Sequence, residues 1–360
     1  MTSQKSHLEG NILLSPHDQA QARSYSYHLL GTVFLQGVHD GNISQLRALP
    51  TLASQLKAFP SDESIAAGLG PEAQEVFDHA AADHQHWFGF NLFPFQSIFL
   101  SEDCRVGGDQ THAVLEAYQK SSFPIATKGD SPDHIGVMLY FLGFLSQREA
   151  QGWDQNNPPA VQAAQAASLE FLDTHLLEWL PPFVVALRQT QHPFYSLLGD
   201  VLWALVLEHR EQLGSESSQK VGVALGQGDG SSFLEHEKTS LRDIAAYCLT
   251  PFKSGWYITR DTIRTFSREQ EAPAGFGGRQ LMLHNLFRSA VEYEGLPAVL
   301  TSMQRYTNEW VGAYQSLDDQ GLSIVKDAVK RWVSRVESTH ALLGTMKEKV
   351  FHLQDEPLPE

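Results

Sequence analysis

Helix-forming patterns run through almost the whole chain, whereas strand-forming patterns are scarce. Alternating runs of β-branched residues are nearly absent, and Leu, Ala, Gln and Glu dominate the segments between Pro and Gly breaks. The stretch from Ala160 to Leu180, AVQAAQAASLEFLDTHLLEWL, is typical, and it runs into Pro181 and Pro182. Such a chain can bury its apolar residues only by packing helices on one another. The sequence therefore predicts an all-α fold.

Capping residues and helix breakers place the individual helices. Ser15 can cap a first helix with Pro16 at its first position, and this helix runs to about Gly37. Between Gly89 and Leu100 the chain is apolar and aromatic but interrupted by Pro94, which predicts an extended connection packed on helices. Further helices are expected at residues 42–59, 71–88, 109–123, 132–149, 160–180, 192–213 and 321–350.

A change of composition divides the chain. From Gly214 to Thr239 it is rich in Gly, Ser, Gln and Glu, which is linker composition. Helical patterns then resume and alternate with Pro and Gly turns. The sequence predicts a helical bundle at residues 1–213, a linker at 214–239, a smaller helical region at 240–350 and a free tail at 351–360. The region 240–350 is called the C-terminal extension below.

Charge and cysteine usage narrow the class of protein. The 26 Lys and Arg residues against 42 Asp and Glu residues give a net charge of -16. This charge disfavours nucleic acids and anionic membrane surfaces as partners and favours a partner with a basic segment. Cys104 and Cys248 lie far apart, which fits a reducing compartment. Without a signal-peptide pattern or an apolar run long enough for a membrane span, we expect a cytoplasmic protein.

The histidines and glycines show no spacing that is typical of a metal or catalytic site. The histidines are densest at His79, His84 and His86, but neither H-E-x-x-H nor H-x-x-E-H occurs. The glycines of GQGDG at residues 226–230 match no phosphate-binding loop and fit a flexible linker better. A G-x-S-x-G nucleophile elbow is also absent. We therefore expect no metal site, no bound cofactor and no catalytic residue.

The adjacent Asp133 and His134 allow three interpretations. Ser131 can cap the helix that follows, Pro132 suits its first position, and Asp133 then lies near the unpaired N–H groups of the first turn. His134 has no role in this structural interpretation. Side chains of neighbouring residues leave a helix about 100° apart, so the two cannot form a catalytic pair without a third group. A helix start, an active site and a recognition surface therefore remain open.

An aromatic run precedes this turn in the sequence. Its rings could simply belong to the core. A segment that is interrupted by Pro94 cannot bury all of them on one helix face, however, and rigid rings suit an apolar peptide. We therefore expect some of these rings to line a groove. The run comprises Trp87, Phe88, Phe90, Phe93, Phe95 and Phe99.

Four motifs in a fixed order resemble a known family. They lie within residues 15–212 and read ARSYSYHLLGTVF, WFGFNLFPFQSIFLSED, DSPDHIG and FLDTHLLEWLPPFVVALRQTQHPFYSLLGDVLWAL. Their order and spacing resemble the TorD/DmsD/NarJ family of cytoplasmic redox-enzyme maturation chaperones. The resemblance implies an all-helical protein that acts by binding and not by turnover.

The same resemblance implies the partners. The client would be the apo form of a molybdopterin-containing oxidoreductase catalytic subunit. It would be bound through its twin-arginine signal peptide, or another segment, until its cofactor is inserted. The molybdenum-cofactor insertion machinery is a further partner that the resemblance suggests.

Binding residues are also implied by the resemblance. The acidic-Pro-x-Asp-His turn of the family matches residues 130–134, although the proline is displaced by one position and Asp130 replaces the commoner glutamate. The HPFY motif at residues 192–195 is expected to lock the last helix of the bundle. The expected client-binding residues are Trp87, Phe88, Leu92, Phe93, Phe95, Asp133 and His134.

Two other functions stay open beside the chaperone. One is a small hydrolase that uses His134 as its general base, and the other is a helical scaffold without catalysis. The C-terminal extension resembles that of longer members of the same family. It is interpreted either as a helical addition that packs on the bundle or as a second contact surface for the client.

Overall fold

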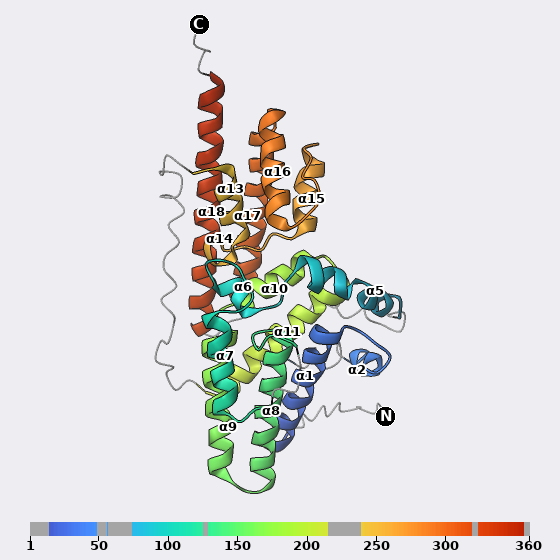
Figure 1. Cartoon of the computed structure of the whole chain (residues 1–360). Coiled ribbons are helices and arrows are strands. Elements are labelled where there is room, and N and C mark those ends of the chain that lie inside the picture. Colours follow the sequence, from blue (N-terminus) through green and yellow to red (C-terminus); the bar gives the residue numbers. More distant parts are fainter. Residues whose placement is uncertain are drawn as a thin grey trace, which may run out of the picture.

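The computed structural model describes residues 14–48, 56, 74–124, 129–214, 239–318 and 323–355. Helices form the regular structure of these ranges, apart from an isolated antiparallel bridge between Phe95 and His134. The predicted all-α fold is thereby confirmed (Figure 1).

The bundle comprises α1 (Pro16–Gln36), α2 (Ile43–Leu46), α5 (Gln74–His84), the π-helix η1 (Gln85–Asn91), α6 (Gln96–Leu100), α7 (Asp109–Lys120), α8 (Ile135–Asp154), α9 (Pro158–Phe171), the π-helix η2 (Leu172–Leu176), α10 (Leu180–Gln189) and α11 (Pro193–Gln212). The extension comprises α13 (Leu241–Leu249), α14 (Pro251–Ser254), α15 (Arg260–Glu269), α16 (Arg279–Glu292), α17 (Leu296–Asp318) and α18 (Ser323–Asp355).

Helices α1 and α8 pack along each other in the bundle, and α9 returns beside α8 (Figure 1). Two glycines permit the close approach of α1 and α8. A Cβ atom on Gly136 would lie 2.8 Å from the carbonyl oxygen of Gly31, and one on Gly31 would lie 2.9 Å from that of Gly136. Larger side chains at these positions would push the two helices apart. The distance between α1 and the start of α8 is therefore set by the absence of side chains.

The helices of the extension lie at one end of the bundle. In Figure 1, α13, α15 and α16 lie above α6 and α10, the lower end of α18 reaches down beside α6, and α17 and α18 run along each other. Trp332 of α18 donates its indole N–H to the carbonyl oxygen of Glu178 at 2.8 Å. Arg331 of the same helix forms an ion pair with the Glu178 carboxylate at 2.7 Å. The extension is thus anchored on the residues that lead into α10.

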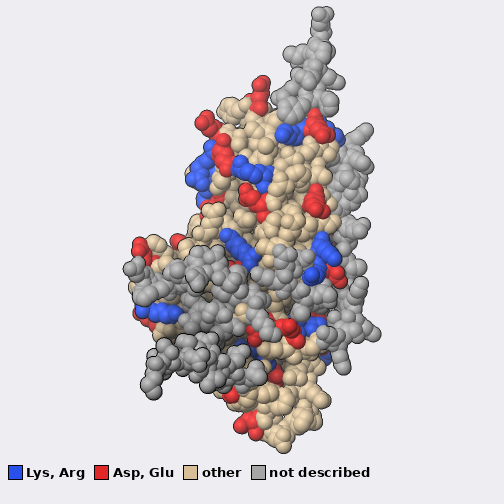
Figure 2. Space-filling view, turned by 180° about the vertical axis from the view of Figure 1, so that it is seen from behind, with Lys and Arg blue, Asp and Glu red and all other residues tan. Residues whose placement is uncertain are grey.

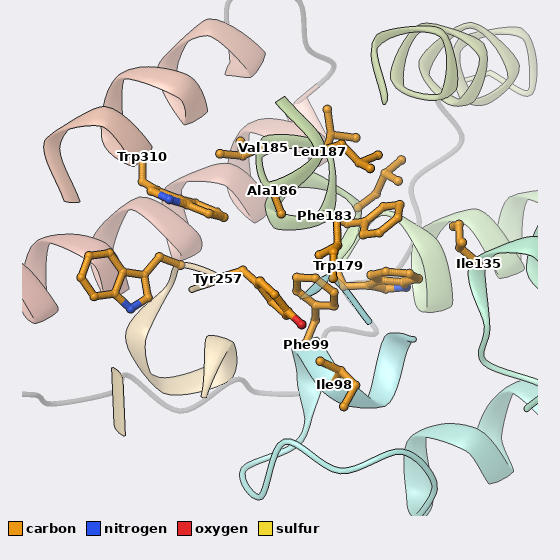
Figure 3. Packing of buried hydrophobic residues seen from close by; sticks show 14 of the residues in the cluster. Ile98, Phe99, Ile135, Trp179, Phe183, Val185, Ala186, Leu187, Tyr257 and Trp310 are labelled. Carbon is orange, nitrogen blue, oxygen red and sulfur yellow. The ribbon is translucent and has the colours of Figure 1, made fainter. Parts of the chain in front are cut away.

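One hydrophobic core continues from the bundle into the extension. Figure 3 shows Phe99 of α6 between Tyr257 of the extension and Trp179 of the bundle. The centroids of the stacked Phe99 and Tyr257 rings are 5.4 Å apart, and the Phe99 ring lies 5.3 Å from that of Trp179. Trp310 of α17 points into the same region beside α10 (Figure 3). Because these rings are buried on both sides of the boundary, the extension has a defined position on the bundle.

Several helix boundaries differ from the prediction for local reasons. The helix expected at residues 160–180 ends in η2 at Leu176. Pro181 and Pro182 lie in the first turn of α10, where a missing N–H costs no helical hydrogen bond. The connection expected to be extended at residues 89–100 consists of the end of η1, a short link and α6. Helix α18 continues past the expected end at residue 350, to Asp355.

Some predicted regions lie outside the described ranges. Of the helix expected at residues 42–59, the structure describes α2, and residues 49–55 and 57–73 fall outside. Residues 215–238 of the expected linker and residues 356–360 of the expected tail also fall outside. The division into bundle, linker, extension and tail stays a prediction. None of the described helices is long and apolar enough to cross a membrane.

Replacing Gly136 with alanine is expected to destabilise the fold, because the new Cβ atom would meet the backbone oxygen of Gly31. We expect the free energy of unfolding to fall by about 1–3 kcal/mol. Gly312→Ala in α17 is the matched control, since a Cβ atom there meets nothing within 4 Å. The control should stabilise the protein by roughly 0.5–1 kcal/mol, because alanine favours a helix. Urea denaturation followed by circular dichroism measures both, and equal effects would contradict the role of the glycine contact.

Candidate functional site

The Asp133–His134 turn joins the first residues of α8 to the first residues of α6. The backbone N–H of Ile135 donates to the carbonyl oxygen of Pro94 at 2.8 Å, and the N–H of Gln96 donates to the carbonyl oxygen of Asp133 at 3.0 Å. The Asp133 carboxylate accepts the backbone N–H of Ser97 at 2.9 Å. Asp133 therefore satisfies N–H groups at the start of α6, which helical hydrogen bonds cannot reach.

The prediction that Ser131 caps α8 and that Pro132 begins it is wrong. Helix α8 begins at Ile135, and its N-cap is His134, whose Nδ1 accepts the backbone N–H of Gly136 at 3.0 Å. Ser131 instead donates its hydroxyl to the Asp133 carboxylate at 2.5 Å. The reason is tertiary, because the Asp133 side chain is committed to α6 and cannot serve the first turn of its own helix. His134 thus has the structural role that the sequence did not suggest.

Burial sets the charge of this turn. Asp133 is 0% exposed and His134 is 8% exposed. Burial lowers the pKa of His134 to about 4, although the negative charge of Asp133 opposes this change. The imidazole is therefore neutral at neutral pH, as its accepting hydrogen bond with Gly136 requires. Asp133 bonds Ser97 and Ser131 rather than orienting the imidazole, so the turn lacks the arrangement of a hydrolase triad.

The residues of the aromatic run point in different directions. Phe88 and Leu92 are buried in the core, and the Phe88 ring forms T-shaped contacts with the rings of Phe34 and Tyr195, whose centroids are 5.5 and 5.2 Å away. A π-helix such as η1 distributes its side chains differently from an α-helix, so neighbouring rings do not share one face. Phe88 and Leu92 therefore anchor the aromatic run in the core.

Phe95 and Phe93 contact different neighbours. Phe95 is half-buried, and its ring meets the His134 ring with centroids 4.9 Å apart. Phe93 is also half-buried, and its backbone N–H donates to the Tyr257 hydroxyl at 3.1 Å. The guanidinium of Arg279 lies 5.6 Å from the centre of the Phe93 ring and 4.4 Å from that of Tyr257. The structure therefore brings Phe95, Asp133 and His134 together and places Phe93 against the extension.

Trp87 borders a cleft between the bundle and the extension. The cleft has a volume of about 340 Å³ and is called the junction cleft below. One wall comes from η1 and the end of α10, and the opposite wall comes from α15 and α17. The lining residues are Trp87, Ala186, Gln189, Thr190, Gln191, Tyr257, Thr259, Asp261, Thr262, Thr265, Phe266, Glu269, Arg305, Tyr306 and Glu309.

The acidic lining residues of the junction cleft were not predicted as site residues. Asp261 forms a hydrogen bond with His86 Nε2 at 2.7 Å and an ion pair with Arg264 at 2.7 Å, and Glu269 forms an ion pair with Arg305 at 2.7 Å. A usable signal was present, because α15 buries Ile263 and Phe266 along one side and carries charged residues elsewhere. The sequence did not reveal that this helix faces Trp87, since the two are far apart in the chain.

A second cavity lies among α7, α8 and α9, away from the predicted binding residues, and has a volume of about 350 Å³. Its walls are mostly alanine and phenylalanine, with Lys120 and Arg148 among the lining residues. His175 also lines it, and burial lowers the pKa of this imidazole to about 4. The lining of this cavity holds two basic residues and one acidic residue, Glu170, whereas acidic residues predominate in the junction cleft.

The described ranges hold no metal-ligand cluster, and the face drawn in Figure 2 has no single charged area. They contain no group of three or more His, Cys, Asp or Glu residues that could hold a metal ion. In the dense histidine segment, His86 binds Asp261 and the His84 ring approaches the carbonyl oxygen of Phe34 at 3.2 Å. On the face drawn in Figure 2, acidic and basic side chains are interspersed. The net negative charge is therefore not gathered in one area of that face.

Comparisons with known proteins agree on one family. A family model described as the nitrate reductase delta subunit matches residues 47–185. The chaperone protein TorD of Shewanella sp. (strain MR-4) is 26% identical over 218 residues, covering 56% of this chain and 98% of that relative. The selenate reductase assembly chaperone protein of Thauera selenatis is 34% identical over 88 residues, covering 24% and 44%. The probable Tat proofreading chaperone DmsD of Haemophilus influenzae is 27% identical over 108 residues, covering 29% and 46%.

The relatives that these comparisons find are named chaperones, not enzymes. The family model and the named relatives support the resemblance to the TorD/DmsD/NarJ family of maturation chaperones that the motif order predicted. Because the relatives are named chaperones, the prediction that the protein is not an enzyme is confirmed. The family match ends at residue 185, before the C-terminal extension begins.

The buried His134 is expected to make the protein less stable in acid. The unfolded chain binds a proton at His134 near pH 6.5, whereas the folded chain does so only near pH 4. Stability is therefore lost as the pH falls from 6.5 towards 4, by up to about 3 kcal/mol from this group. His134→Asn keeps an N-cap acceptor without this titration. Urea unfolding between neutral pH and pH 4 should show a steeper loss for the wild type, and parallel curves would contradict the assignment.

Proposed function

We propose that this protein is a cytoplasmic chaperone for a molybdopterin-containing oxidoreductase. It binds the twin-arginine signal peptide of the apo catalytic subunit, or another segment of it, before cofactor insertion and export. The family resemblance supports this function, because relatives are named for selenate and chlorate reductase assembly and for Tat proofreading. The molybdenum-cofactor insertion machinery is the proposed second partner.

The observation that carries the proposal is the position of Trp87 in the junction cleft. The indole is half-buried in a cleft of about 340 Å³, a volume at the lower end of the range for ligand sites, about 300–1,000 Å³. Large rings at the edge of a cleft bind peptide side chains with little loss of conformational entropy. Trp87 comes from the segment that the family motif marks for client binding.

The other predicted binding residues divide into two groups under this proposal. Phe93 and Phe95 are half-buried and continue the surface that the client contacts. Phe88, Leu92, Asp133 and His134 are buried and hold that surface in place. The client therefore meets the aromatic rings, and the Asp133–His134 turn positions them.

Charge supports a peptide client with a basic segment. The net charge of -16 favours the approach of a cationic peptide. The charged residues that line the junction cleft are Asp261, Glu269, Glu309 and Arg305, so carboxylates outnumber cations there. Binding should weaken as salt screens these charges.

Trp87→Ala is expected to weaken peptide binding at least tenfold, because one large ring of the cleft is lost, at a cost of about 2 kcal/mol. The probe is a synthetic twin-arginine leader peptide of a molybdopterin-containing catalytic subunit, titrated by calorimetry. Trp153→Ala is the matched control, since Trp153 lies on α8 and is 40% exposed. Equal affinities of the two variants would place the client elsewhere.

A further inference from the structure

The C-terminal extension completes the junction cleft with groups that recognise a cation. Asp261 and Glu269 of α15 and Glu309 of α17 contribute three carboxylates, and Arg305 contributes the one cationic side chain among the lining residues. The hydroxyl groups of Thr259, Thr262 and Thr265 are further possible acceptors in the lining. A ligand with several N–H donors and a positive charge fits such walls.

Aromatic rings in the same cleft favour a planar cation. Trp87 lines the cleft from η1, and the largely buried rings of Phe266 and Tyr306 line it from the extension. A guanidinium group stacks on such rings and bonds carboxylates through a planar fork, which a lysine ammonium cannot do. The junction already holds one guanidinium in this way, because that of Arg279 lies over the rings of Tyr257 and Phe93.

The carboxylates of the cleft remain partly available. Arg305 contacts the two carboxylate oxygens of Glu269 at 2.7 and 2.8 Å, whereas its Nε is 3.9 Å from the Glu309 carboxylate. The side chains of Arg305 and Glu309 are 58% and 49% exposed. Exposed ion pairs of this kind are weak, so an incoming guanidinium can share or replace the Arg305 contacts.

We propose that the C-terminal extension supplies a subsite for an arginine side chain of the client peptide, with Trp87 as one wall and Glu269 and Glu309 as the charged wall. This inference rests on the proposed function, since it names the part of the peptide that enters the junction cleft. It assigns the extension a direct role in client recognition. The family model and the bundle do not include these carboxylates, because they lie after residue 185 in the extension.

The test uses the full chain and two synthetic peptides. One carries two adjacent arginines followed by a Leu- and Ala-rich stretch, and the other has citrulline in place of both arginines. Citrulline keeps the shape of arginine but removes its charge. Wild type should bind the arginine peptide about tenfold or more tightly than the citrulline peptide, as measured by calorimetry.

The double variant Glu269→Gln/Glu309→Gln should lose this preference, so that both peptides bind with similar affinity. Glu170→Gln/Glu337→Gln is the control with the same change of charge, because these carboxylates lie on α9 and on α18, outside the junction cleft. The control should keep the wild-type preference. Circular dichroism verifies that the variants are folded.

The outcomes separate this inference from the proposed function. If the Glu269/Glu309 variant still prefers arginine as strongly as wild type, the arginine subsite is refuted while the chaperone proposal stands. Trp87→Ala could lower the affinity for both peptides while wild type and this variant each bind the two peptides equally well. That result would also overturn the inference. If wild type binds neither of these peptides nor the leader peptide, both proposals fail.

Discussion

The buried carboxylate of Asp133 joins the two helices on which the candidate site depends. It accepts an N–H from the first turn of α6, while backbone hydrogen bonds of the same turn hold Pro94 and Gln96. An unsatisfied buried N–H would cost about 1–3 kcal/mol, so α6 is fixed at the start of α8. Phe99 of α6 stacks on Tyr257 of the extension, and this contact helps to hold the extension on the bundle. The position of the junction cleft thus follows from the burial of one side chain.

Because the bundle and the extension share one hydrophobic core, the extension forms part of the candidate site at the junction cleft. Tyr257 contacts both Phe93 and Phe99, and Trp332 and Arg331 bind Glu178. Of the two interpretations of the extension, the structure shows the packing on the bundle, and the packed helices also supply a wall of the cleft. Its role in client contact remains our proposal.

Local sequence signals predicted the fold well where the determining interactions are local. Ser15 caps α1 with Pro16 at the first helical position, as expected, because cap and helix are neighbours in the chain. The aromatic run and the Asp-His turn were predicted to form one binding site. Phe95 of the run contacts His134 in the structure, and client binding by these residues stays a prediction. The N-cap role of His134 could not be predicted, because it depends on Asp133 being committed to a distant helix. Asp261 and Trp87 border the same cleft only in the folded chain, so the acidic wall of the cleft was missed for the same reason.

The central claim is that a client peptide binds between the bundle and the extension. Hydrogen–deuterium exchange read by mass spectrometry, with and without the leader peptide of the client subunit, tests it most directly. The account predicts slower exchange in η1, residues 85–91, and in α15, residues 260–269, when the peptide is present. Protection confined to the helices around the second cavity, α7 to α9, or no protection at all, would contradict it.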